Sequence, residues 1–348
     1  MLNMTKIILA LMVWGACSAA FAEEGESIVF NPATGNYLIT HYSEFDKKFE
    51  QLIFIPATKI NPMFQSKFKL EQNGVIKYEY TLINGPDSRQ MIRRFILDPV
   101  SSVTSSLPDI PLNAPPGKIM ADMMNVASHF DTPPAPWRAM MGYSTGEMSF
   151  RISLGYRQET GGLAPGSKVA LGFKSLDLPS IIQAEIYAYA PSSQEIDGEE
   201  LPDAEDGGFG QQYFALIRNN FLRRYAAVPT IAVPSPFDAA VTLERIQANT
   251  HTWIGMKLLD VTFSSQLDRS LTAAADAYRR NQLKAGKDHI QDVRLLLKKA
   301  YTDLENQDIV DEETGNNQGA QFKNGMIARL AARVLDFNVK YVLKQLEK

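Results

Sequence analysis

Apolar and polar residues alternate along much of the chain between Ser27 and Tyr189. The pattern is clearest where Ile76, Tyr78, Tyr80 and Leu82 alternate with Lys77, Glu79, Thr81 and Ile83. A period of two places successive side chains on opposite faces of a strand. Similar short runs, rich in β-branched and aromatic residues, predict strands at Tyr37 to Tyr42, Phe49 to Pro56, Ser66 to Gln72, Met148 to Tyr156, Val169 to Phe173 and Ile181 to Tyr189.

Turn residues follow the clearest strand. Asn84-Gly85-Pro86-Asp87 separates it from the run Gln90 to Leu97, which is again rich in Ile, Met and Phe. We therefore predict a β-hairpin from Val75 to Leu97. Because turn pairs such as Asn-Gly, Pro-Gly and Gly-Gly separate the strands, and amphipathic helices do not, the pattern predicts an antiparallel β-sandwich.

Two segments interrupt the predicted strands. Leu107 to Trp137 holds seven prolines, and so many cannot sit in central strands, so we predict a long excursion packed on the sandwich. Ser192 to Gly210 is acidic and rich in glycine, and we expect an exposed loop there. Tyr225 to Val233 carries Pro229 and is interpreted as an extended link.

The hydrophobic period changes to three and four after the link. Ser235-Pro236-Phe237-Asp238 predicts a helix start with Ser235 as the cap. Four apolar stripes follow, with breaks expected at Gly286 and from Asn306 to Gln321, and they predict four amphipathic helices packed as a bundle: Leu243, Ile246 and Trp253; Leu267, Leu271, Ala274 and Tyr278; Ile290, Val293, Leu297, Ala300 and Leu304; Ile327, Leu330, Val334, Phe337 and Tyr341.

The predicted fold class is therefore α+β, an antiparallel β-sandwich followed by a helical bundle. We place a β-sandwich domain with its two insertions at 23–233 and a helical domain at 234–348. Ala331, Leu335 and Val342 form a second apolar row on the last helix. Two rows predict two neighbours, one of which could be the sheet or a partner protein.

The first 22 residues have the pattern of a signal peptide. Lys6 precedes the apolar run Ile7 to Trp14, and Ala20-Phe21-Ala22 offers small residues for cleavage. A lipoprotein leader using Cys17 is the alternative. We expect the mature chain to begin at Glu23 and to be exported, either to a periplasm or to the extracellular space. Cys17 is the only cysteine, so the mature chain can form no disulfide.

Charge and hydropathy restrict the partners. The formal net charge of the 348 residues is −4, whereas a nucleic-acid-binding chain is expected to carry a clustered basic face. After the leader, no segment approaches the length of a membrane span. We therefore expect a protein or glycan ligand, no nucleic acid and no membrane span.

Two parts of the chain resemble known exported proteins. The run Tyr78 to Gln90, with Leu163-Ala164-Pro165-Gly166-Ser167 and Leu176-Asp177-Leu178-Pro179, resembles a loose class of exported bacterial β-sandwich proteins. The tail is similar to the small helical modules called FIMAH through Ser265-Gln266-Leu267, Leu271, Ala274-Ala275 and Arg329-Leu330-Ala331-Ala332. These resemblances imply a sandwich with a helical module and do not imply an activity.

One motif matches a catalytic pattern. Gly142-Tyr143-Ser144-Thr145-Gly146 has the spacing of a hydrolase nucleophile elbow, which needs a helix after the serine. Glu147 to Tyr156 alternates as a strand instead. Gly161 to Lys168 is a near match to a phosphate loop, but Ser167 precedes Lys168 and a strand follows, so we interpret it as an exposed Pro-Gly turn.

The remaining candidates are metal ligands and aromatic platforms. No two of His41, His129, His251 and His289 have metal-ligand spacing. The acidic loops Glu195 to Asp206 and Asp308 to Asn317 could bind calcium but lack the ligand pattern of an EF-hand. Trp253 lies on a helix stripe and is predicted to be core, while Trp137 stays open as a carbohydrate platform or interface anchor.

We therefore assign no catalytic, cofactor-binding or metal-binding residue. The sequence favours an exported non-catalytic protein that acts in binding or surface assembly. The alternatives are an exported serine hydrolase using Ser144 and a calcium-stabilised structural module.

Overall fold

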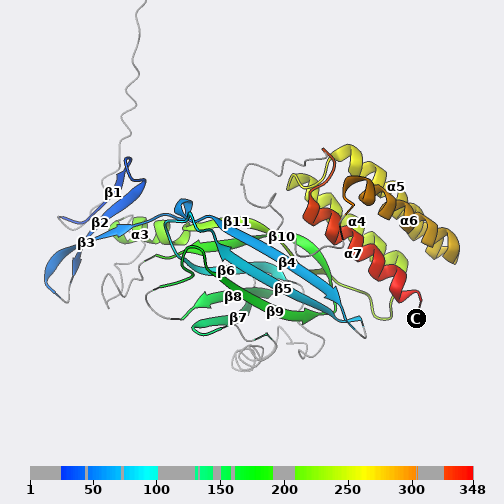
Figure 1. Ribbon diagram of the computed structural model, residues 1–348, viewed down its shortest axis with the longest axis horizontal. Coiled ribbons are helices and arrows are strands. Elements are labelled where there is room, and N and C mark those ends of the chain that lie inside the picture. The colour runs from blue at the N-terminus through cyan, green and yellow to red at the C-terminus, as the bar shows by residue number, and fades with distance from the viewer. Residues whose placement is uncertain are drawn as a thin grey trace, which may run out of the picture. The chain divides into compact units, whose positions relative to one another are not determined.

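A computed structural model describes residues 25–43, 46–71, 74–100, 130–131, 134–143, 150–157, 161–190, 208–302, 304 and 325–347 (Figure 1). The chain is α+β, as the sequence predicts, and every pairing between its described strands is antiparallel. The described residues form two compact units. One comprises residues 25–54 and 208–219, and the other comprises 55–190 and 220–347.

The smaller unit holds one three-stranded sheet and one helix. Its strands β1 (Ser27–Asn31), β2 (Asn36–Ser43) and β3 (Lys48–Phe54) follow one another in the sheet, and α3 (Phe209–Arg218) contacts β1. Ile39 and Phe54 are buried on one face. The sequence predicts β2 and β3 correctly, but it misses β1 and α3.

The larger unit contains two sheets. The first has the order β11-β10-β6-β8-β7 and the second the order β4-β5-β9. A 3₁₀ turn, η1 (Ala57–Lys59), precedes them. The strand bounds are β4 (Pro62–Leu70), β5 (Ile76–Asn84), β6 (Ile92–Val100), β7 (Trp137–Tyr143), β8 (Phe150–Tyr156), β9 (Lys168–Ser175), β10 (Leu178–Ala188) and β11 (Phe221–Ile231).

The predicted hairpin from Val75 to Leu97 is wrong. β5 pairs with β4 and β9, whereas β6 pairs with β10 and β8. Residues 85–91 therefore carry the chain from one sheet to the other. Both strands are heavily apolar, so each can lie inside its own sheet, and turn residues alone do not decide which strands pair.

Side chains from the two sheets meet in one core. The rings of Phe64 on β4 and Phe95 on β6 have centroids 5.3 Å apart. Tyr80 on β5 donates its hydroxyl hydrogen bond to the carbonyl of Ala227 on β11, at 2.9 Å. Arg224, also on β11, is buried and donates from Nε to the Pro62 carbonyl at 3.0 Å. Apolar packing and buried hydrogen bonds thus join the sheets.

Four helices complete the larger unit, and the sequence predicts each of them. They are α4 (Ala239–Gly255), α5 (Val261–Arg279), α6 (Leu283–Ala300) and α7 (Arg329–Gln345). The predicted cap is wrong, because Asp238 rather than Ser235 accepts the backbone hydrogen bond of Val241 at the start of α4. The predicted break at Gly286 is also wrong. Gly286 lies inside α6, and the chain turns at 280–282 instead.

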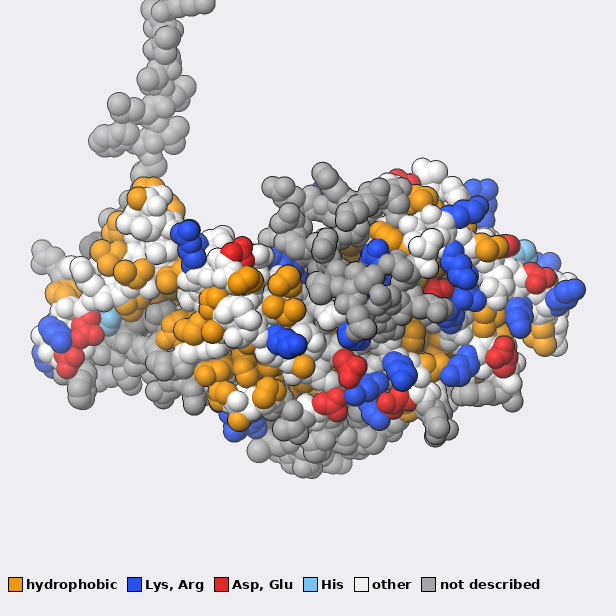
Figure 2. Space-filling model, viewed as in Figure 1, with side chains coloured by type: hydrophobic (Ala, Val, Ile, Leu, Met, Phe, Trp, Pro, Cys, Tyr) orange, Lys and Arg blue, Asp and Glu red, His pale blue; other side chains and the backbone are white. Residues whose placement is uncertain are grey.

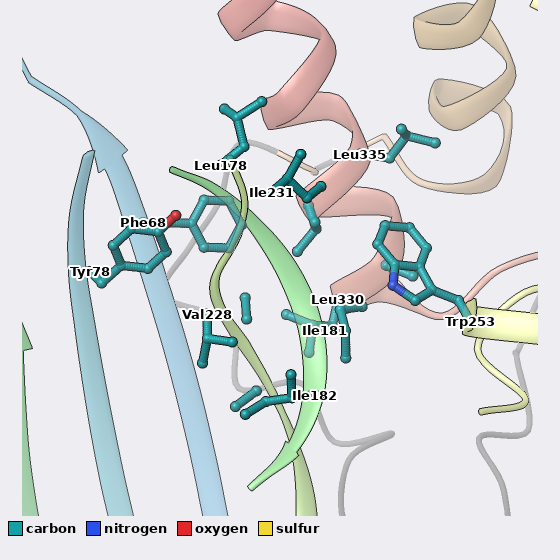
Figure 3. Packing of buried hydrophobic residues seen from close by; sticks show 14 of the residues in the cluster. Phe68, Tyr78, Leu178, Ile181, Ile182, Val228, Ile231, Trp253, Leu330 and Leu335 are labelled. Atoms are coloured by element: carbon teal, nitrogen blue, oxygen red, sulfur yellow. The ribbon is translucent and has the colours of Figure 1, made fainter. Parts of the chain in front are cut away.

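The helices pack on the strands through both apolar and polar contacts. Phe337 of α7 packs edge-on against Phe68 of β4, with ring centroids 5.0 Å apart. Trp253 is fully buried, as predicted, and its Nε1 donates to Ser180 of β10 at 3.3 Å. Figure 3 shows Trp253 with apolar side chains from strands and from α7 in this core. The sheet is therefore the second neighbour of α7.

Tyr225 to Val233 is not only a link, because most of it belongs to β11, which pairs with β10 along its length. Pro229 is tolerated there since β11 lies at the edge of the described sheet. The predicted domain boundary at 233/234 falls within the larger unit and stays a prediction. The signal segment, His129, Ser144, the acidic loops and most of the proline-rich excursion lie outside the described residues.

Candidate functional site

The outward face of the five-stranded sheet carries an ordered group of arginine and aromatic side chains. Cross-strand partners share a face, and one row of partners runs from Tyr187 on β10 through Arg94 and Gly155 to Arg138 on β7. Their sequence neighbours Phe95, Leu154 and Ala139 point into the core. We call this surface the arginine face and define it by Arg94, Asp98, Arg138, Met140, Gly142, Arg151, Gly155, Glu185, Tyr187, Phe221 and Arg223.

Aromatic rings and guanidinium groups stack at one end of the arginine face. The Tyr187 and Phe221 rings have centroids 5.0 Å apart. The Arg94 guanidinium carbon lies 4.6 Å from the Tyr187 centroid, and that of Arg223 lies 5.2 Å from the Phe221 centroid. Such cation–π contacts hold the guanidinium plane in place while leaving its N–H groups free to bind other groups.

Two carboxylates neutralise part of this charge. Asp98 accepts from Arg151, with Nε to Oδ2 at 2.8 Å, and forms a two-nitrogen ion pair with it. Glu185 accepts from the Tyr187 hydroxyl at 2.8 Å and from Arg223 at 3.3 Å. Among the described residues, no carboxylate lies within ion-pair distance of Arg94 or Arg138. The face therefore keeps two positive charges that are not paired within the described part of the chain.

Burial and a carboxylate act together on one phenol of the face. Burial raises the pKa of Tyr187, and its hydrogen bond to Glu185 raises that pKa further. Arg94 and Arg151 act in the opposite direction on the same pKa. Tyr187 consequently stays protonated and serves as a fixed hydrogen-bond donor to Glu185.

Two glycines lie on the arginine face. Among the described residues, a Cβ on Gly142 would meet no atom within 4 Å, and one on Gly155 would meet only the Arg94 stem, at 3.9 Å. Gly142 is the cross-strand partner of Arg151, just as Gly155 is the partner of Arg94 and Arg138. Met140, between them on β7, is 44% exposed. Among the described residues, the backbone at the two glycines is therefore open to a ligand, next to the exposed Met140 side chain.

The two sheets of the larger unit differ in the cation they use. Strands β6, β7, β8 and β11 contain arginine and no lysine, and β10 contains neither, whereas β4, β5 and β9 contain lysine and no arginine. We call the outward group Lys67, Lys69, Lys77, Glu79, Lys168 and Lys174 the lysine face. Ion pairs such as Lys77–Glu79 at 2.9 Å and Lys174–Glu71 at 2.7 Å cross it. Figure 2 shows basic and acidic side chains intermingled over these strands.

Ser144 and residues 145–149 lie outside the described part of the chain, and only the strands on either side of the motif are placed. Gly142 and Tyr143 end β7, and β7 pairs antiparallel with β8, which begins at Phe150. A nucleophile elbow instead joins a strand to a helix. Lys168 of the near-match to a phosphate loop begins strand β9, so no helix N-terminus is available there to bind phosphate.

The described histidines lie on three different elements, β2, α4 and α6. His41 is buried on β2 in the smaller unit. His251 Nε2 lies 2.9 Å from Asp268, joining α4 to α5, and His289 lies 3.7 Å from Asp292 on α6. Within the described ranges, no three His, Cys, Asp or Glu side chains come together as a metal site.

Trp137 is not an exposed platform. It is buried, and its ring packs edge-on against Tyr156 with centroids 5.4 Å apart. Sequence reasoning missed the arginine face, although one signal was available. Arg94, Arg138, Arg151 and Arg223 each occupy a strand position of the polar parity, and the neighbouring residues on either side are mostly apolar.

The fold and this face define an α+β protein with an outward arginine and aromatic surface on one sheet. No family model matches the sequence, and no curated protein matches it. None of the helices in the described residues is long and apolar enough to cross a membrane.

Proposed function

We propose that this chain is an exported, non-catalytic binding protein of a bacterial envelope or its surroundings, and that the arginine face is its recognition surface. Export rests on the leader pattern at residues 1–22. The observation that carries the binding role is the separation of arginine from lysine between the two sheets. Arginine, tyrosine, phenylalanine and methionine are enriched at protein–protein interfaces, whereas lysine is depleted there.

We further propose that the two sheets of the larger unit form a β-sandwich and that α4 to α7 form a helical bundle of the FIMAH type. The ring contact between Phe64 and Phe95 and the hydrogen bond from Tyr80 to Ala227 support the first part. The succession of α4, α5 and α6, which are joined by short turns and each packed against the next, supports the second. In this arrangement the helices and the arginine face belong to one scaffold, which holds the face rigid.

The experiment compares the wild-type protein with Met140→Glu in the cells that export it. A glutamate at this exposed position adds a negative charge to the face without removing a buried contact. We expect the wild type to sediment with the envelope fraction and the variant to shift toward the soluble fraction. Equal sedimentation of the two proteins would count against the arginine face as the recognition surface.

The rival function is an exported hydrolase that uses Ser144. A serine-reactive probe applied to the purified mature protein separates the two. We expect no labelling that depends on Ser144. Labelling that disappears in Ser144→Ala would replace the binding proposal with the hydrolase.

A further inference from the structure

We propose that the arginine face binds an anionic polysaccharide, whose acidic groups lie against Arg94 and Arg138 above Gly155 and Gly142. This inference rests on the proposed binding function and adds the chemical class of the ligand. It begins from the two arginines that have no carboxylate partner among the described residues. A guanidinium group matches a carboxylate or a sulfate with two parallel hydrogen bonds.

The arginines are held ready for such a ligand. Arg94 lies on the Tyr187 ring with its guanidinium carbon 4.6 Å from the centroid, and Tyr187 is itself held by its hydrogen bond to Glu185. A guanidinium group that is already oriented loses less conformational freedom when it binds an anion. The neighbouring cations Arg151 and Arg223 are occupied by Asp98 and Glu185, so they frame the site and do not compete for the ligand.

The geometry favours an extended polymer over a compact anion. Arg94 on β6 and Arg138 on β7 are separated by β8, and strands lie about 4.8 Å apart, so the two backbones are about 10 Å apart. A single small anion held by both guanidinium groups would draw Arg94 away from the Tyr187 ring, which lies on the side of β6 opposite to Arg138. Acidic groups that recur along an extended chain can instead pair with each guanidinium in its own fork geometry.

The backbone exposed at a glycine of the arginine face provides a further contact surface for a sugar. Gly155 lies between Arg94 and Arg138 in the cross-strand row, and because it has no side chain, no described side chain closes the backbone there to the ring of a sugar. The exposed Met140 thioether lies on the same face and offers an apolar contact to ring carbons. The alternative ligand is an acidic protein surface. If that were the ligand, a polymer built from one repeating sugar acid would not bind to the arginine face.

The test measures binding of the mature protein, residues 23–348, to two pairs of polymers. Polygalacturonate is compared with its methyl ester, and dextran sulfate is compared with neutral dextran. We expect binding to at least one charged member and not to its neutral counterpart. The charged polymer that binds more tightly then identifies the acidic group as carboxylate or sulfate.

Two variants test the site itself. Arg94→Gln with Arg138→Gln removes both charges, and Gly142→Glu adds bulk and negative charge where a Cβ meets nothing within 4 Å. We expect each to weaken binding at least tenfold and to leave the circular dichroism spectrum and melting temperature close to those of the wild type. Lys69→Gln with Lys168→Gln, on the lysine face, is the matched control and should change affinity less than threefold.

Three results would overturn the proposal: no binding to either charged polymer, equal binding to the neutral members, or an equal loss in the lysine-face control. The last would mean that net charge alone attracts the polymer. If the polymers fail to bind while Met140→Glu still releases the protein from the envelope fraction, the proposed binding function stands and the polysaccharide is wrong. If Met140→Glu has no effect either, both are wrong.

Discussion

Asn338 on α7 donates a hydrogen bond from Nδ2 to the carbonyl of Pro179 on β10, at 2.9 Å, and is fully buried. Pro179 is the cross-strand partner of Pro229 on β11. Neither proline has an N–H group, so no backbone hydrogen bond can form between them. A helix side chain thus satisfies a carbonyl at a position where the sheet cannot do so, and this ties α7 to the strands.

Replacing Asn338 should therefore destabilise the whole larger unit. Asn338→Leu keeps the volume but leaves the Pro179 carbonyl buried without this donor, and we expect a loss of about 1–3 kcal/mol in the free energy of unfolding by urea. The control is Asn249→Leu on α4, where the amide bonds only to its own helix, at the Arg245 carbonyl. That variant should stay within about 0.5 kcal/mol of the wild type. Similar losses in both variants would contradict the role of the helix-to-strand hydrogen bond.

Gly286 should not tolerate a methyl group. Although alanine favours a helix by about 1 kcal/mol over glycine, a Cβ at this position of α6 would lie 2.6 Å from the Tyr278 ring. We expect the overpacking in Gly286→Ala to cost about 1–3 kcal/mol and to exceed the helix gain. Gly255→Ala at the end of α4, where nothing lies within 4 Å, should be neutral or slightly stabilising in the same thermal melts. A Gly286→Ala protein as stable as Gly255→Ala would show that Tyr278 moves aside freely.

The stability of the protein should fall at alkaline pH, partly through Tyr278. Burial raises the pKa of Tyr278 to about 12, above the value near 10 of an unfolded tyrosine. The folded state therefore favours the neutral phenol. This contribution is complete below about pH 10 and is lost as the pH rises through about 12. Tyr278→Phe should make the decline in urea midpoint between pH 9 and 12 shallower, and an unchanged slope would contradict the assignment.

The same tyrosine predicts a contrast at neutral pH. The Tyr278 hydroxyl is buried and has no hydrogen-bond partner among the described residues, so Tyr278→Phe should be neutral or slightly stabilising. Tyr80 is buried too, but its hydroxyl donates to the Ala227 carbonyl. Tyr80→Phe should consequently lose about 1 kcal/mol. Unfolding in urea at pH 7 measures both variants, and the reverse order would contradict the hydrogen-bonding pattern.

A fragment from Thr230 to Lys348 tests the boundary predicted at 233/234. Arg333 of α7 is 2% exposed and donates to the Ser66 carbonyl on β4, so cutting the chain exposes groups that the strands normally cover. We expect a helical circular dichroism spectrum, binding of a hydrophobic dye and a broad thermal transition. Cooperative melting without dye binding would instead show that the helices have a sufficient core of their own.

The α+β class and most elements follow from hydrophobic periodicity, because a period of two or of three to four is a local property. The pairing of strands is not local. Asn84 to Asp87 has the composition of a hairpin turn, but the partner of β5 is decided by which buried faces meet, and β9 lies more than 80 residues further along the chain. The prediction of the helix cap is wrong for a similar reason. Both Ser235 and Asp238 can cap a helix, and the backbone conformation of the residues between them determines that Asp238 is the cap.

The arginine face could be predicted only in part. Alternation marks Arg94 and Arg151 as outward-facing residues in apolar strands, and their choice over lysine is visible in the sequence. The sequence does not show that Arg94 and Arg151 lie on neighbouring strands, because this depends on the strand order β11-β10-β6-β8-β7. Tyr187 and Glu185 come from a strand that is remote in sequence. A surface assembled from four or more strands can be recognised only after the register is known.

The order of the strands has a consequence for biogenesis. In the larger unit, β4 and β5 belong to the sheet β4-β5-β9, and β6, β7 and β8 belong to the five-stranded sheet. The chain then returns to the first sheet with β9 and ends in the five-stranded sheet with β10 and β11. Neither sheet can be finished before β9 and β11 have been delivered, so contacts distant in sequence must form late and slowly. If the chain is exported as proposed and crosses the membrane amino terminus first, both sheets would stay incomplete until most of the chain had emerged. Their unpaired strand edges would need protection from aggregation during that time, for example by a chaperone.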